Sequence, residues 1–227
     1  MAPGWLTAVA WVWLGLSFPS AGVIVVDIVR GYRQHMRVME WVWPITALYL
    51  GPFALWAYWD FGRSYSTKRM EERGGMPEVA HWKRVAVSTS HCGSGCTLGD
   101  IVAEWIVFAA ALAIAGTALY ASFVLDYAFA LAFGLVFQFF AIRQMGERSP
   151  VQGAVRALKT DVISLTAFEV GLFAWMAIMF FLFLDRDHVT PSDASYWLVM
   201  QIGMILGFAT SYPANAWMIR RGLKDAM

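Results

Sequence analysis

Long runs of apolar residues, separated by short polar connections, dominate the sequence. Six of these runs approach the length of about 20 residues that a helix needs to cross the hydrocarbon core of a bilayer. They cover residues 5–28, 38–59, 97–120, 125–142, 161–184 and 196–219. Charged residues gather in the connections, above all in residues 61–91 and 143–159. The pattern predicts an all-α integral membrane bundle of about six transmembrane helices, forming a single domain over residues 1–227.

The composition supports the same class of protein. The chain is 59% hydrophobic and carries 12 Trp and 16 Phe, which is unusually apolar for a soluble domain of 227 residues. A net charge of +1 gives no reason to expect a nucleic-acid partner. The first apolar run has no Lys or Arg before it and is long enough to span, so we expect a membrane helix rather than a cleaved signal peptide.

The placement of Lys and Arg predicts an orientation. With six spans, both termini share one side of the membrane with residues 61–91 and 143–159, where most of the positive charge lies. The positive-inside rule then predicts a multi-pass protein of the cytoplasmic (inner) membrane with both termini in the cytoplasm. Arg30, Arg33 and Arg37 run against this arrangement, because it puts them on the opposite side.

Both cysteines of the chain lie in one short polar stretch, next to a histidine. Cys92 and Cys96 are four residues apart, and His91 precedes the first of them. Gly93 and Gly95 are expected to let the backbone between the cysteines turn freely. Thiolate and imidazole are ligands that suit Cu(I) or Zn. The alternatives are two simple buried thiols or a disulfide.

Two carboxylates continue from this stretch into the apolar run that follows. Thr97 has the character of a helix N-cap, which would put Cys96 just outside a helix N-terminus, where the thiolate is favoured. Asp100 and Glu104 are four apart and therefore share a helix face. The predicted metal ligands are His91, Cys92, Cys96, Asp100 and Glu104. The alternative is that Asp100 only caps the helix and Glu104 only forms an ion pair.

Glu104 and Glu169 fall inside predicted spans. A charged side chain at the bilayer centre costs on the order of 3 kcal/mol even on insertion scales, so each glutamate indicates a function or a buried partner. An ion or proton path is the functional interpretation, and structural pairing is the alternative. The candidate structural partners are Lys159, Gln138 and Thr117. Asp126 and Asp161 lie near span ends, where we expect them at the surface.

Methionines and small residues add two further patterns in the last two spans. The predicted ion path consists of Glu169, Met176, Met200 and Met204. Thioethers are soft ligands for Cu(I), although methionine more often fills gaps between helices. In the last span small residues recur at every fourth position, a spacing that predicts close helix packing. These packing residues are Gly203, Gly207 and Ser211.

Three segments carry a resemblance to a known family. They are residues 89–100 (TSHCGSGCTLGD) with 103–105 (AEW), residues 43–46 (WPIT), and residues 207–222, which end the last span. Together they resemble an uncharacterised bacterial and archaeal membrane family, catalogued as domain of unknown function 4396. The resemblance implies an integral membrane protein and leans towards heavy-metal handling, without supplying an established activity.

Together these patterns predict a membrane protein that handles or transports a soft metal ion. The ion expected is Cu(I), with Zn as the second candidate, captured by His91, Cys92 and Cys96. The alternatives are a membrane thiol oxidoreductase that uses the two cysteines, and a non-catalytic accessory subunit of a membrane complex. A non-enzymatic role is favoured over an enzyme. The expected partners are the lipid bilayer, a cytoplasmic metal donor or other membrane subunits, and further copies of the chain.

Overall fold

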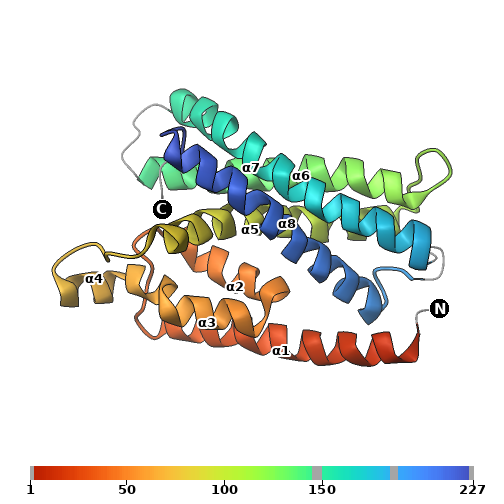
Figure 1. The fold of residues 1–227 in the computed structure, drawn as a ribbon, viewed down its shortest axis with the longest axis horizontal. Coiled ribbons are helices and arrows are strands. Elements are labelled where there is room, and N and C mark those ends of the chain that lie inside the picture. Colours follow the sequence, from red (N-terminus) through yellow and green to blue (C-terminus); the bar gives the residue numbers. More distant parts are fainter. Residues whose placement is uncertain (1–2, 145–149, 185–188, 225–227) are drawn as a thin grey trace.

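The structure, a computed structural model, describes residues 3–144, 150–184 and 189–224, with the side chains of 142, 144 and 150–160 excepted. Helices account for most of this part of the chain, and no strand is formed within it. Five helices are long and apolar enough to cross a membrane (Figure 1). They are α1 (Gly4–Val29), α5 (His81–Ala109), α6 (Ala118–Gln144), α7 (Pro150–Ile178) and α8 (Ala194–Arg220). The expectation of an all-α membrane bundle is therefore confirmed.

The predicted second span, residues 38–59, is a helical hairpin instead of a single crossing. It consists of α2 (Met39–Leu50) and α3 (Pro52–Asp60), which reverse direction at Gly51. Gly51 has a φ of 55°, a left-handed value that a residue with a side chain adopts at a cost. The backbone N–H of Thr67, after the hairpin, donates to the carbonyl of Arg33, before it, at 2.9 Å. Both ends of the hairpin therefore lie at the same end of the bundle.

The tip of the hairpin lies at about half the depth of the bundle. The twelve residues of α2 span about 18 Å, against the ~30 Å of a hydrocarbon core. A Cβ added at Gly51 would lie 3.1 Å from Oγ of Ser17, which stands midway along α1. The side-chain amide of Gln201, on α8, donates to the carbonyl oxygen of Leu48 in the last turn of α2. That bond satisfies a helix-end carbonyl where no water is available to do so.

A hairpin that returns to its own side leaves an odd number of full crossings. As a result α1 begins at one end of the bundle and α8 ends at the other (Figure 1). The structure thus has five long crossings and a hairpin where about six crossings were expected, and α1 begins at the opposite end from that at which α8 ends. Residues 30–38 now lie at the same end as residues 61–80, which also removes the conflict posed by the three arginines of that connection.

We call the end where α1 and α8 finish the basic end. Every Lys and Arg in the described segments lies there or in the adjoining helical turns. They are Arg30, Arg33, Arg37, Arg63, Lys68, Arg69, Arg73, Lys83, Arg84, Arg143, Arg156, Lys159, Arg220, Arg221 and Lys224. The short elements η1 (Gly62–Tyr65) and α4 (Thr67–Arg73) lie at this end too. Arg63 pairs there with Asp27 at 2.9 Å, and this hydrogen bond raises the pKa of the guanidinium.

The third crossing begins sixteen residues earlier than the predicted start at residue 97, and ends eleven residues before the predicted end at residue 120. Thr97 is therefore an interior residue and not an N-cap, and Cys96 lies within the helix. The hydroxyl of Thr97 donates to the carbonyl of Gly93 at 2.8 Å, as small polar side chains do inside helices. Residues 110–117 form the turn to α6, which itself starts before the predicted residue 125.

Glycines of α5 serve close helix packing rather than a flexible turn. A Cβ on Gly95 would lie 2.8 Å from Cα of Gly134, and one on Gly99 would overlap the backbone nitrogen of Ala130. Small residues four apart on both helices therefore let α5 and α6 approach closely. The expectation that Gly93 and Gly95 give a free turn between the cysteines is wrong, because both are helical.

Helices α7 and α8 pack by the same means. A Cβ on Gly207 would lie 2.7 Å from the carbonyl oxygen of Phe168, and Gly203 lies against Leu172. Ser211, four residues further on, donates to the carbonyl of Ser164 at 2.9 Å. The small residues of α8 thus face α7 along most of the crossing.

Candidate functional site

Four chemically active side chains form one stripe along α5. Cys92, Cys96, Asp100 and Glu104 follow at intervals of four residues, so they share one face of the helix. All four are buried inside the bundle, with at most 1% of each residue exposed. Because α5 begins at His81, this stripe starts about 16 Å along the helix and occupies its middle and far half. The site therefore lies in the membrane interior and not at a surface mouth.

Three other helices supply polar groups to the same stripe. Glu169 of α7 faces the Cys96 thiol, and neither of its carboxylate oxygens has a hydrogen bond of normal geometry. Asp126 of α6 is buried near Asp100, whose own oxygens are without a hydrogen-bond partner. Ser122, also on α6, donates to Glu104 at 2.9 Å. Asp126 is thus an interior residue, contrary to the expectation that it lies at the surface.

The two thiols lie side by side. Cys92 and Cys96 are both free, and each is within hydrogen-bonding reach of the other. The α2–α3 hairpin contributes Tyr49, in the last turn of α2, to the surroundings of the thiols. The buried hydroxyl of Tyr49 has no hydrogen-bond partner of normal geometry. A Cβ on Gly93 would lie 3.0 Å from that hydroxyl, which places it against the helix segment that bears the thiols. The thiol pair is therefore bordered by a carboxyl group and a hydroxyl group from two other helices.

His91 stands apart from the thiols. Neighbouring residues on a helix point in different directions, and the ring of His91 packs edge-on against Phe137, with centroids 6.2 Å apart. Both ring nitrogens are buried without a hydrogen-bond partner. In the described part of the chain, no three His, Cys, Asp or Glu side chains are gathered closely enough to hold a metal ion. The predicted five-residue ligand set is therefore not assembled around one point.

The methionines predicted to line an ion path are core residues. Met176, Met200 and Met204 are almost completely buried and belong to the same packed cluster as the two cysteines. Phe168 and Leu172 of α7 belong to this cluster too. The three thioethers thus have the ordinary packing role of methionine in a helix bundle.

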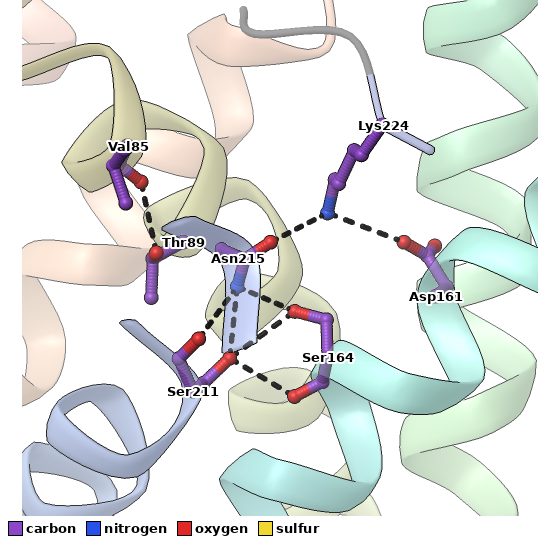
Figure 2. A network of polar contacts seen from close by, with 7 residues as sticks. All are labelled: Val85, Thr89, Asp161, Ser164, Ser211, Asn215 and Lys224. Atoms are coloured by element: carbon purple, nitrogen blue, oxygen red, sulfur yellow. Dashed lines mark hydrogen bonds and ion pairs between the residues drawn. The ribbon is translucent and has the colours of Figure 1, made fainter. Parts of the chain in front are cut away.

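A second buried polar network, at the basic end, was not anticipated from the sequence. Figure 2 shows Lys224 reaching back into the bundle, where its ammonium donates to Oδ1 of Asn215 at 3.0 Å and lies 3.6 Å from Asp161. The amide of Asn215 donates in turn to Ser164 and Ser211. Asp161 is buried, so the expectation of a surface position is wrong. Asn215 extends the four-residue repeat of α8 beyond Ser211. This spacing is the sequence signal that could have placed Asn215 in the contact between α7 and α8.

Lys159, proposed as a structural partner for the intramembrane glutamates, has a side chain outside the described residues. Glu104 has Ser122 as its partner. Gln138 is buried on α6, and its side-chain oxygen has no hydrogen-bond partner. The structural alternative therefore accounts for Glu104 in part, whereas the carboxyl of Glu169 faces a thiol and has no hydrogen bond of normal geometry in the described structure.

These features define a class: an all-α integral membrane protein with five long apolar helices, a half-depth hairpin and a cluster of thiols and carboxyl groups in its interior. The profile of the family described as "Domain of unknown function (DUF4396)" matches residues 81–224, and the chain belongs to this family. The resemblance noted in the sequence is thereby confirmed. No curated protein and no solved structure matches the chain. The matched region contains α5 to α8 and hence the whole interior cluster except Tyr49.

Proposed function

We propose that the protein binds Cu(I) between the thiolates of Cys92 and Cys96 in the membrane interior and takes part in moving or handling this ion. The observation that carries the proposal is the pair of free, adjacent, buried thiols bordered by the unpartnered Glu169 and Tyr49. Soft thiolate ligands select Cu(I), and two of them suffice for it. Zn in structural sites takes four ligands. Since the described residues gather no group of three, the geometry favours Cu(I) over Zn.

The neighbouring carboxyl group fits the proton chemistry that such binding requires. Thiols must lose their protons before they bind a metal, so binding releases protons. Glu169 faces Cys96 and has no other partner of normal geometry, which suits it to accept a proton from that thiol. Asp100 and then Glu104 continue along α5 towards the end opposite the basic end. This line of carboxyl groups would let a proton or cation leave the thiols without entering lipid.

The three methionines give the ion a soft environment beside the thiols. Met176, Met200 and Met204 share a packed cluster with Cys92 and Cys96. A thioether contact would stabilise Cu(I) during transfer without adding charge. A cytoplasmic metal donor or another membrane subunit would then supply or accept the ion. Because the sequence contains no nucleotide-binding motif, active transport would depend on an ion gradient or on such a partner.

Two alternatives receive less support from the geometry. A thiol oxidoreductase must bring a partner sulfur or a quinone to Cys92 or Cys96, and both are at most 1% exposed. A purely structural subunit does not account for the buried Glu169 and Asp100, whose oxygens have no hydrogen-bond partner of normal geometry in the described structure. An unsatisfied buried polar group is costly and calls for a reason.

For the orientation, we propose that the basic end faces the cytoplasm. All Lys and Arg of the described segments gather at this end, which is the arrangement that the positive-inside rule associates with the cytoplasmic side of the inner membrane. On this proposal α8 ends in the cytoplasm, and α1 begins on the opposite side. Ions would therefore approach the thiols from the basic end, which carries Lys224.

The metal content of protein purified anaerobically in detergent tests the proposal. We expect near-stoichiometric copper after loading with Cu(I) in the wild type, and its loss in a Cys92→Ser/Cys96→Ser variant. Ser88→Ala is the matched control, because Ser88 is buried on the same helix and has no hydrogen-bond partner there. Copper retained by the double variant, or absent from a correctly folded wild type, would overturn the proposal.

A further inference from the structure

Two apolar grooves lie side by side on the membrane-facing surface around α2. One has a volume of 390 Å³ and runs between α2, α5 and α6, and the other has a volume of 580 Å³ and runs between α1, α2 and α5. They share Trp41, Ile45 and Leu98 in their walls. Trp41 is 70% exposed and thus forms a ridge between the two grooves.

Each groove starts at an arginine at the basic end. Arg37 lines the first groove and Arg33 the second. Arg33 also contacts Glu40 at 2.8 Å, and its side chain remains 59% exposed. From these arginines the grooves descend along α2 to Leu98, which lies near the middle of α5. They therefore lie within the half of the bilayer next to the basic end.

We propose that these grooves bind one anionic phospholipid of the leaflet next to the basic end, with one acyl chain on each side of Trp41 and the headgroup phosphate at Arg33 and Arg37. Three features point to this occupant. Apart from the Glu40 carboxylate, which pairs with Arg33 in the second groove, the walls below the arginines are apolar, so hydrocarbon fills the grooves at less cost than water. Two grooves that share one ridge match a lipid with two chains. Guanidinium groups at both mouths complement a phosphate, and Arg33 keeps 59% of its side chain exposed although two of its nitrogens pair with Glu40.

The position of the site gives it a structural role. The α2–α3 hairpin ends at half depth, so its outer face lacks the neighbouring helix that a full span would have. A lipid seated along α2 would cover this face and support the segment that carries Tyr49 towards the thiol pair. The inference does not depend on metal binding, because it uses only the grooves and the charges at their mouths.

Thermal unfolding of the delipidated protein in an uncharged detergent tests the proposal. We expect phosphatidylglycerol to raise the unfolding temperature more than phosphatidylcholine does, and this difference to disappear in an Arg33→Gln/Arg37→Gln variant. Lys68→Gln/Arg69→Gln is the matched control, because it removes two positive charges from α4 at the same end and away from the grooves. An equal effect of both lipids on the wild type would overturn the proposal, as would an unchanged preference in the Arg33/Arg37 variant.

A second measurement separates a two-chain lipid from a simple surface charge effect. Val136 lines only the first groove and is exposed to lipid, so Val136→Trp should fill this groove without disturbing the core. We expect native mass spectrometry to find one bound phosphatidylglycerol on the wild type and a severalfold smaller bound fraction on Val136→Trp. Binding unaffected by this substitution would show that the groove is not occupied by an acyl chain. A dimer without bound lipid would show that a second copy of the chain covers the surface instead.

Discussion

Nζ of Lys224 lies 3.6 Å from Oδ1 of Asp161, and both side chains are 1% exposed. Lys224 reaches this position because the chain reverses after α8 at Gly222, which has a φ of 67°. Among the Lys and Arg side chains that the structure describes, it is the buried one, because its ammonium points into the bundle and not into the solvent (Figure 2). The pair thus ties the segment after α8 to the start of the membrane-crossing part of α7.

Lys224→Met should be strongly destabilising, because it leaves Asp161 buried without its counter-charge. Loss of one partner of a buried ion pair costs about 3–5 kcal/mol of the free energy of unfolding. The double variant Asp161→Asn/Lys224→Met should lose less than the sum of the single variants, as unfolding in mixed detergent would reveal. Arg69→Gln is the control, since it breaks a half-exposed pair with Glu72 and should cost less than about 1 kcal/mol. If the double variant instead loses as much stability as the two single variants together, Asp161 and Lys224 are not coupled.

Tyr49→Phe should separate metal binding from folding. The Tyr49 hydroxyl is buried without a hydrogen-bond partner of normal geometry, so its removal should leave the unfolding temperature unchanged or raise it. If the hydroxyl supports a metal-bound thiol pair, the affinity for Cu(I) should fall by about 10-fold, as for other groups that support metal ligands. Competition with a chromogenic Cu(I) chelator measures this affinity. An unchanged affinity would remove Tyr49 from the proposed site.

Gly99→Ala should disrupt the contact between α5 and α6. The new methyl group would overlap the backbone of Ala130, which cannot move as a flexible side chain can. Overpacking of this kind costs about 1–3 kcal/mol or more. Gly15→Ala on α1 is the matched control, because a Cβ there meets nothing within 4 Å. Equal unfolding temperatures for the two variants would contradict the close approach of the helices.

Single cysteines should reveal the half-depth hairpin directly. In a Cys92→Ser/Cys96→Ser background, His35→Cys and Met76→Cys should react with a membrane-impermeant thiol reagent from the same side, because both positions lie at the basic end. Leu112→Cys, in the turn between α5 and α6, should react only from the other side. A full crossing over residues 38–59 would instead put positions 35 and 76 on opposite sides.

The fold class and most crossings follow from apolar run length, but residues 81–96 show why one boundary was misplaced. This segment is rich in Ser, Thr and Gly, which favour loops in water. Inside the bundle Ser94 donates to the carbonyl of Ser90, and Thr89 donates to that of Val85 at 2.8 Å, in each case four residues back (Figure 2 shows the second bond). The segment is thus helical because its small side chains fit between other helices, and that fit depends on residues distant in sequence.

The hairpin and the site were hidden for related reasons. The apolar run of residues 38–59 has the same hydrophobic pattern whether it crosses the membrane or returns to its own side. The reversal depends on the backbone conformation of Gly51, whose φ is 55°. The four-residue spacing of Cys96, Asp100 and Glu104 did predict their common face. The approach of Tyr49 and Glu169 could not be predicted, because it depends on how α2 and α7 pack against α5.

The bond between Gln201 and Leu48 has a consequence for the order in which the protein is made. The two residues are 153 positions apart, and Gln201 belongs to α8, which is synthesised after α1 to α7. Until α8 is inserted, the carbonyl of Leu48 has no such donor and would be held at a depth where water is absent. A nascent chain should therefore keep the tip of its hairpin shallow, near the headgroups, and draw it down only after α8 has been made and inserted.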